Sequence, residues 1–218
     1  MRFSIFLVIV IFLTGCASIS SRESMEADVD RAVAIIERFE AIPESAIPPA
    51  VMRAARGLAI LTVTKAGFVA SVRGGTGVVV ARTDAGWSGP SAIGTGGLGV
   101  GLQAGAEVAE LVIVLNTPEA VNAFAQGGNV TLGGALSVAA GPIGRTAEAG
   151  VAVGAAMYSY SRSQGLFAGI SLEGTVLATR DRVNAGYYGE PVEPTEILAG
   201  RLQPPPSAQK LLDVLSKY

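Results

Sequence analysis

The chain has 218 residues, of which half are hydrophobic, 16% are charged and 6% are aromatic. The net charge is −2, histidine is absent and cysteine occurs once. Without histidine there can be no Ser-His-Asp triad, Cys-His nucleophile pair or HExxH metal helix. A single cysteine excludes an intramolecular disulfide and a CxxC zinc site. The near-neutral charge argues against a nucleic-acid partner, because such proteins carry a dense basic surface.

The first sixteen residues predict a lipoprotein signal. Arg2 precedes the apolar run 3–13 (FSIFLVIVIFL), which is shorter than the ~20 residues of a membrane-spanning helix and is typical of a secretory signal. The run ends in Leu13-Thr14-Gly15-Cys16, which resembles a bacterial lipobox. We expect a signal peptide over 1–15, acyl chains on Cys16 as a membrane anchor and a tether over 16–23. The alternative is an ordinary signal peptide with a chance cysteine.

The residues after the cysteine predict a location. Ala17 and Ser18 follow Cys16, where an aspartate is typical of lipoproteins retained at the inner membrane. We therefore expect a lipid-anchored protein of the bacterial cell envelope, at the outer membrane and facing the periplasm.

Two helices are expected next. Met25, Val29, Val33 and Ile36 recur at helical spacing within 23–41, with Ser24 as the N-cap. This helix is acidic and stops at the proline at position 43. A second helix is expected to start at the two prolines 48–49 and to end at Gly57.

From position 58 the sequence favours strands. Three are expected, LAILTV (58–63), GFVASV (67–72) and GVVVAR (77–82), separated by turns at 65–67 and 74–76. The segment 107–115 is ambiguous between helix and strand, and its β-branched second half favours strand. Further strands are expected at 130–140, 146–160, 165–172 and 175–179, and helices at 118–124, 194–198 and 208–216.

Glycine is concentrated in this β-rich part. Of the 28 glycines, 26 lie between Gly57 and Gly189, where glycine inside strands indicates bulges, sharp bends or close backbone approach. The predicted fold class is α+β, with a glycine-rich, mainly antiparallel, strongly curved sheet or barrel-like core and helices at both ends. The stretch 94–99 matches GxGxxG, but the glycine-rich residues after it do not favour the helix that a dinucleotide site requires. We assign these glycines to packing.

Five basic residues form a candidate lipid-binding cluster, since each cation near an anionic membrane surface contributes on the order of 1 kcal/mol. The alternative is ordinary solvated charge. The cluster consists of Arg53, Arg56, Lys65, Arg73 and Arg82.

A polar pair is expected farther along the chain. Arg162 and Glu173 stand among apolar strand residues and are predicted to pair across a hairpin near 164–167, because buried charges need partners. A catalytic role would need Glu173 or Glu107 in an open cleft with a second titratable group, and no such spacing is evident. We expect no enzyme activity, no cofactor and no metal.

The segment 158–174 (YSYSRSQGLFAGISLEG) resembles the signature of the SYLF domain family, also known as the Ysc-type actin-binding domain. The segments 57–68 (GLAILTVTKAGF) and 74–82 (GGTGVVVAR) support the resemblance, which spans about 46–200. It implies a single lipid-binding domain, here 24–218. Eukaryotic members are associated with phosphoinositide membranes and actin-patch machinery, and bacterial members are secreted proteins or lipoproteins. The acidic helix 23–41 departs from the basic amphipathic helix of the eukaryotic relatives.

The resemblance and the lipobox together predict an envelope lipoprotein. Its domain is expected to bind membrane lipid or an anionic phospholipid surface, in addition to its own acyl anchor. The alternative is a structural or adaptor lipoprotein that binds a protein partner, of unknown identity, and has no lipid site of its own.

Overall fold

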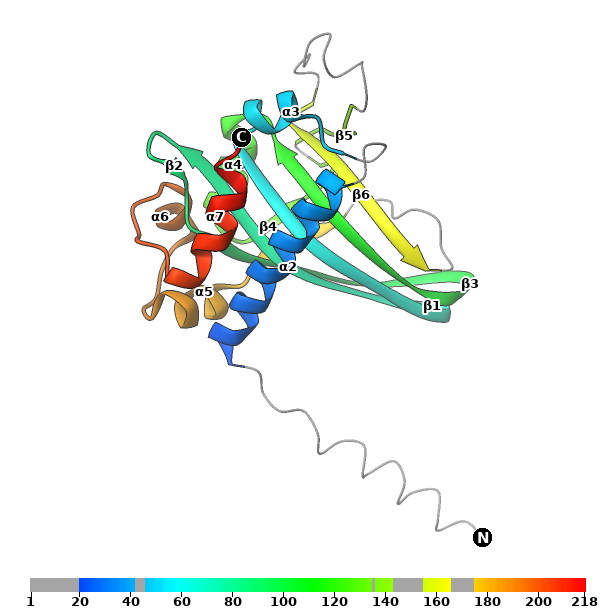
Figure 1. Ribbon diagram of the computed structural model, residues 1–218. Helices are drawn as coiled ribbons and strands as arrows, with labels where there is room; N and C mark the ends of the chain where they lie inside the picture. The colour runs from blue at the N-terminus through cyan, green and yellow to red at the C-terminus, as the bar shows by residue number, and fades with distance from the viewer. Residues whose placement is uncertain (1–19, 42–45, 135, 143–154, 166–174) are drawn as a thin grey trace, which may run out of the picture.

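The structure is a computed structural model that describes residues 20–41, 46–134, 136–142, 155–165 and 175–218 (Figure 1). The signal segment, Cys16, Glu173 and most of the strands expected at 146–160 and 165–172 lie outside these residues. The helices are α2 (Ser21–Ala41), α3 (Pro49–Ala54), α4 (Pro118–Ala125), α5 (Asp181–Tyr188), α6 (Pro194–Leu198) and α7 (Gln209–Leu215). The strands are β1 (Gly57–Thr83), β2 (Gly86–Trp87), β3 (Ser91–Leu115), β4 (Asn129–Thr131), β5 (Val138–Ala140), β6 (Met157–Gly165) and β7 (Val176–Thr179).

Two long strands, β1 and β3, dominate the sheet. They pair antiparallel from Gly57–Leu115 to Val79–Ser91, with a register shift between Phe68 and Ala70. Figure 1 shows that both strands run to one end of the molecule and bend back there. We call 57–67 the first arm of β1, 71–83 its second arm, and 68–70 the bend. The predicted separate strands at 58–63, 67–72 and 77–82 are therefore wrong, because the chain stays extended through both expected turns.

The two arms of β1 lie against each other. The backbone N–H of Arg82 donates to the carbonyl of Arg56 at 2.8 Å. A Cβ on Gly77 would lie 2.1 Å from the carbonyl oxygen of Ile60, so only glycine fits there. The glycines of the second arm thus permit the tight curl that the sequence predicted.

The sheet that the structure describes has seven strands, in the order β2-β1-β3-β6-β5, with β7 between β3 and β4. Only β5 and β6 pair in parallel among these strands. The predicted class is confirmed: the fold is α+β, with a strongly curled, mainly antiparallel sheet and helices at both ends of the chain.

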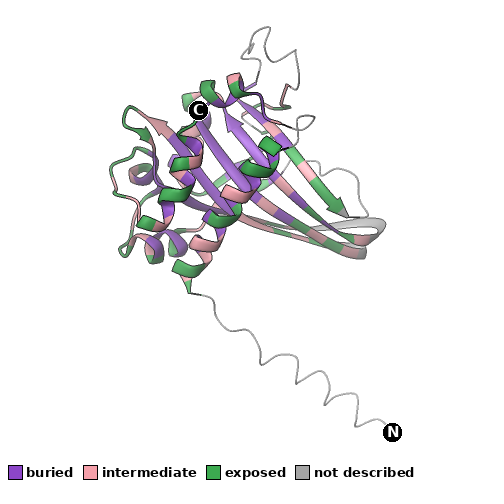
Figure 2. Ribbon diagram, viewed as in Figure 1, coloured by how far each residue is buried: buried purple, intermediate pink, exposed green. Residues whose placement is uncertain are grey.

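Each face of the sheet carries a hydrophobic core. Even-numbered residues of β1, such as Leu58, Ile60 and Val78, pack with α2, α5 and α7. Odd-numbered ones, such as Leu61 and Val79, pack with α4, α6 and the short strands. In Figure 2 the strands are buried where α2 crosses them and become exposed toward the bend. Among the described helices, none is both long and apolar enough to cross a membrane.

A capping box starts α2. The Ser20 hydroxyl accepts from the backbone N–H of Glu23, and the Glu23 carboxylate accepts from the backbone N–H of Ser20. These hydrogen bonds hold the pKa of Glu23 below its usual value, chiefly through the Ser20 backbone. The expected N-cap, Ser24, is therefore wrong by one turn, and its hydroxyl serves another contact described below.

Helix α5 was not predicted from the sequence. It contains Gly186, where a Cβ would lie 2.5 Å from the Cβ of Ser21, so the glycine lets α5 pack closely against the start of α2. The helix ends at Gly189, whose φ of 87° is the left-handed conformation that glycine favours at a helix end.

Tyr188, the last residue of α5, predicts a pH dependence of stability. Its hydroxyl donates to the carbonyl of Pro90 at 3.0 Å, and burial, then the neighbouring Tyr187, raises its pKa above the usual value. The folded protein therefore holds this proton more tightly than the unfolded chain does. The corresponding stability is complete below pH ~10 and is lost as the pH rises toward the folded pKa.

We expect the free energy of unfolding of the natural chain to fall more steeply between pH 9 and 11 than that of Tyr188→Phe. Urea unfolding at several pH values measures both slopes. Parallel slopes would show that Tyr188 ionisation is not coupled to folding.

Candidate functional site

Three of the five predicted basic residues lie together where α3 meets β1. Arg53 and Arg56 are exposed, and Arg82 is partly buried behind them. We call these three residues the basic pole. Its position follows from the curl of β1, which brings the end of the second arm beside the start of the first.

Arg82 holds the pole in place. Its Nε donates to the carbonyl of Ala55 at 3.0 Å and its Nη2 to that of Met52 at 3.2 Å, which satisfies carbonyls at the C-terminal end of α3. The guanidinium also stacks on Trp87, 4.3 Å from the ring centroid. Burial and, secondarily, the charge of Arg56 lower the pKa of Arg82 below its usual value. Arg82 therefore positions the pole, while Arg53 and Arg56 form its accessible surface.

The other two predicted residues lie elsewhere. Lys65 is in the first arm of β1, opposite Glu107 of β3. Arg73 is in the second arm, where its Nη1 is 3.5 Å from the Thr175 hydroxyl. Both flank the bend, at the opposite end of the first arm from Arg56. The five residues thus do not form one cluster.

Arg162 contacts α2. Its Nη1 donates to the carbonyl of Arg38 at 2.9 Å, and its guanidinium lies 6.0 Å from the Phe39 ring centroid. Arg38 in turn forms a two-pronged ion pair with Glu110 of β3. Glu173 lies outside the described residues, so the expected pair with Arg162 stays a prediction.

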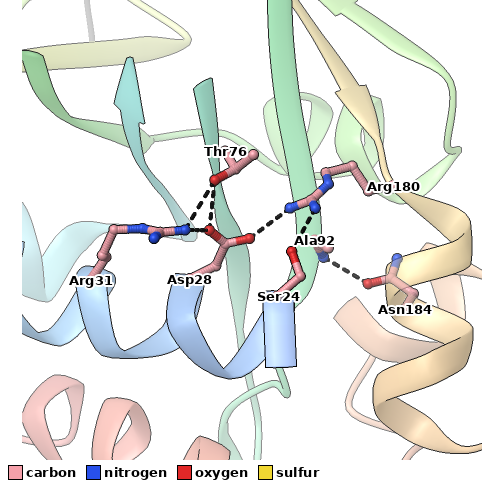
Figure 3. A network of polar contacts seen from close by, with 7 residues as sticks. All are labelled: Ser24, Asp28, Arg31, Thr76, Ala92, Arg180 and Asn184. Carbon is pink, nitrogen blue, oxygen red and sulfur yellow. Dashed lines mark hydrogen bonds and ion pairs between the residues drawn. The ribbon is translucent and has the colours of Figure 1, made fainter. Parts of the chain in front are cut away.

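A buried polar network joins α2, β1 and α5 (Figure 3). Asp28 has no exposed surface, and its carboxylate accepts from Thr76 at 2.7 Å, from Arg180 at 2.6 Å and from Arg31. Arg180 also donates to the Ser24 hydroxyl at 2.8 Å. Sequence reasoning missed this network, although an aspartate between Met25 and Val29 on the apolar stripe of a helix is a signal for a buried ion pair.

Asn184 of α5 extends the network to β3. Its side-chain oxygen accepts from the backbone N–H of Ala92 at 2.7 Å, and its amide donates to the Ser91 hydroxyl at 3.1 Å. Asn184 thereby ties the start of β3 to α5, the helix that begins directly after Arg180. Both carboxylate oxygens of Asp28 and both terminal nitrogens of Arg180 bind protein groups, so we assign this network a structural role.

The GxGxxG stretch lies inside β3 and opens no helix, as expected. Gly94 and Gly96 line an open groove of about 480 Å³, together with Thr76, Val176 and Arg180. A Cβ on Gly94 would lie 3.1 Å from the Arg180 side chain, so this glycine accommodates the arginine of the network.

The described residues do not bring together a set of catalytic or metal-binding groups. Glu107 is only 1% exposed, so it faces no open cleft, and its Oε1 has no hydrogen-bond partner among the described residues. Among the described residues, no three or more acidic, cysteine or histidine side chains are grouped so that they could hold a metal ion.

Comparison with known proteins identifies relatives. The family model described as Ysc84, Las17-binding protein actin regulator, matches residues 96–218. The chain is 47% identical over 204 residues to SH3 domain-containing YSC84-like protein 1 of Xenopus laevis, covering 89% of this chain and 61% of that protein. The human protein of the same name is 46% identical over 203 residues, covering 89% and 59%.

A yeast relative carries a binding partner in its name. LAS seventeen-binding protein 3 of Saccharomyces cerevisiae is 47% identical over 177 residues, covering 79% of this chain and 39% of that protein. The chain thus spans about three fifths or less of the length of these relatives. The match over more than half of the chain, on the fold described above, shows that this chain belongs to the Ysc84 or SYLF domain family.

Proposed function

We propose that the chain is a membrane-tethered binding module whose domain attaches to an anionic lipid surface through the basic pole. The observation that carries the proposal is the state of Arg53 and Arg56. Both are exposed, and neither has a carboxylate partner among the described residues. By contrast, ion pairs neutralise surface charges on and around α2: Arg22–Glu26, Lys210–Asp30 and Lys217–Glu40.

The lipobox supports the tether. Cys16 precedes the first described residue, Ser20, by four positions, which span at most about 14 Å of extended chain. Helix α2 then runs about 31 Å, the length of its 21 residues, and α3 lies near its far end (Figure 1). In a bacterial envelope this arrangement would fix the chain to the outer membrane by its acyl chains and leave the basic pole away from the point of attachment.

A protein partner is the second candidate. The matched family is described as a Las17-binding actin regulator, and the yeast relative is named for the same partner. Two unpaired arginines can dock on an acidic protein surface as well as on lipid phosphates, because guanidinium groups bind both carboxylates and phosphates. Binding to protein-free vesicles separates the two candidates.

We expect the chain from residue 16, with Cys16→Ser, to co-sediment with vesicles containing phosphatidylglycerol more strongly than with phosphatidylcholine vesicles, and to lose this difference at 0.5 M salt. Arg53→Glu/Arg56→Glu is expected to lower the anionic component more than tenfold, because each arginine contributes ~1 kcal/mol near such a surface. Equal binding to both vesicle types would overturn lipid attachment by the pole.

Arg182 provides the matched control. It is exposed and forms no ion pair among the described residues, as is true of Arg56, but it lies on α5. Arg56→Glu and Arg182→Glu change the net charge equally, so a general charge effect would weaken both equally. A loss confined to Arg56→Glu would locate the contact at the pole.

A further inference from the structure

The bend of the long hairpin has no charge. Between Lys65 and Arg73 β1 carries no charged residue, and β3 carries none from Ser91 to Ala106. These two uncharged segments pair with each other through the bend, from Ala66–Ala106 to Val72–Leu98. The result is an uncharged double layer of strands at one end of the molecule, with α5, α6 and α7 at the other end (Figure 1).

The exposed valines lie on one face of this part of the sheet. The large hydrophobic side chains that are exposed among the described residues are Val72 (62%), Val108 (43%) and Val176 (38%). Val72 points to the same face of β1 as Val78, and Val108 points to the same face of β3 as Val112. Val78 and Val112 pack in the core under α2, so Val72 and Val108 face the α2 side of the sheet. In β7, Leu177 belongs to the opposite core, so Val176 also faces the α2 side.

This face continues the sheet surface beyond the part that α2 covers. Toward the bend, its described positions between the valines are small and uncharged, namely Thr64, Ala66, Gly74, Gly96 and Ala106. All five residues are exposed. An exposed apolar surface on a sheet normally marks an interaction site.

We propose that this surface, which we call the uncharged face, rests in the interfacial layer of a lipid bilayer. A bilayer fits for two reasons. An uncharged sheet end can enter the headgroup boundary without desolvating a charge. The nearest charged residues along β1, Lys65 and Arg73, have the parity of Leu61 and Val79, so they lie on the opposite face of the sheet and leave this face uncharged. The inference rests on the proposed function for the presence of a membrane, but it concerns a different surface. Arg56 and the bend are separated by about 36 Å along the first arm.

The test compares Val72→Asp with Val72→Thr in the chain from residue 16 carrying Cys16→Ser. The described core residues lie between Met25 and Leu215, so this chain retains them. Val72 is mostly exposed, and both variants are expected to keep the circular dichroism spectrum of the parent. The probe is a vesicle of pure phosphatidylcholine. Its surface has no net charge, so the basic pole is not attracted to it.

We expect the parent to bind these vesicles with an affinity that is unchanged between 0.15 and 0.5 M salt, Val72→Asp to bind at least tenfold more weakly, and Val72→Thr to keep most of the affinity. Arg53→Glu/Arg56→Glu is expected to leave this binding unchanged, which separates the inference from the proposed function. The inference would be overturned if the parent and Val72→Asp bound the vesicles with equal affinity, or if the parent did not bind them. A parent that sediments as a dimer, and as a monomer with Val72→Asp, would overturn it in favour of self-association.

Discussion

Replacing Gly77 with alanine is expected to prevent stable folding, whereas replacing Gly74 with alanine, three residues earlier in the same strand, is expected to be neutral or stabilising. A Cβ at Gly77 would lie 2.1 Å from the carbonyl oxygen of Ile60 and 2.6 Å from the Cα of Leu61. These are backbone atoms of the first arm, which cannot move without breaking the pairing of β1 with β3. At Gly74 nothing lies within 4 Å of the added atom.

The magnitudes follow from the two environments. Gly77→Ala must separate the two arms, so we expect a loss of more than ~4 kcal/mol, at the extreme of single substitutions. Gly74 does not have a positive φ, so alanine there is expected to gain ~0.5 kcal/mol by restricting the unfolded chain. Urea unfolding measures both variants. If Gly77→Ala yields no folded protein, its soluble yield and protease resistance are compared with those of Gly74→Ala instead. Equal stability of the two variants would contradict the close packing of the arms.

Proline and glycine predicted the ends of two helices well, whereas the N-cap expected for α2 was wrong by one turn. Helix α4 starts at Pro118, as predicted for the helix at 118–124, and it ends just before Gly127 and Gly128, both of which have positive φ. Helix α6 has the predicted bounds, 194–198. Proline and glycine act on the backbone of their immediate neighbours, so such ends can be predicted without knowledge of the fold.

The number of strands could not be predicted in the same way. The Gly74-Gly75-Thr76 stretch indicated a turn, but it lies within the continuous second arm of β1. Gly75 is required because a Cβ there would lie 2.5 Å from the carbonyl oxygen of Thr62. The reason for this glycine is thus a contact with another part of the sheet, and a turn and a close approach have the same sequence signature.

The basic residues show the same limit at the candidate site. Arg53, Arg56 and Arg82 meet because β1 doubles back, and Lys65 and Arg73 are separated from them by the same geometry. Proximity in sequence predicted one cluster of five. Of the three that meet, Arg82 is bound to the end of α3, so charge alone did not distinguish a positioning residue from an accessible one.

Replacing Asp28 with asparagine is expected to lower the free energy of unfolding by about 3 kcal/mol, the low end for breaking a buried ion pair. The low end applies because Arg180 keeps 24% and Arg31 47% of its side-chain surface exposed, so water can solvate both once the carboxylate is gone. Since domains are stable by only about 5–15 kcal/mol, this loss is a large fraction of the total.

Asp30→Asn is the matched control for Asp28→Asn. Asp30 lies one residue beyond Val29 on the same helix and pairs with Lys210, but its side chain is 60% exposed. An exposed pair contributes little, so we expect a loss below about 1 kcal/mol. Urea unfolding compares the two, and equal losses would contradict a structural role for the buried network.

The double variant Asp28→Asn/Arg180→Met separates the ion pair from the packing around it. When both charges are removed, no buried charge lacks a partner, so the double variant is expected to be more stable than the sum of the two single losses predicts. This network ties α2 and the start of α5 to the second arm of β1, but Asp28 itself is fully buried and is no part of the uncharged face. Asp28→Asn should therefore unfold the domain at lower urea while leaving vesicle binding by the folded protein unchanged. A loss of phosphatidylcholine binding by folded Asp28→Asn, equal to that of Val72→Asp, would contradict this separation of the network from the lipid surface.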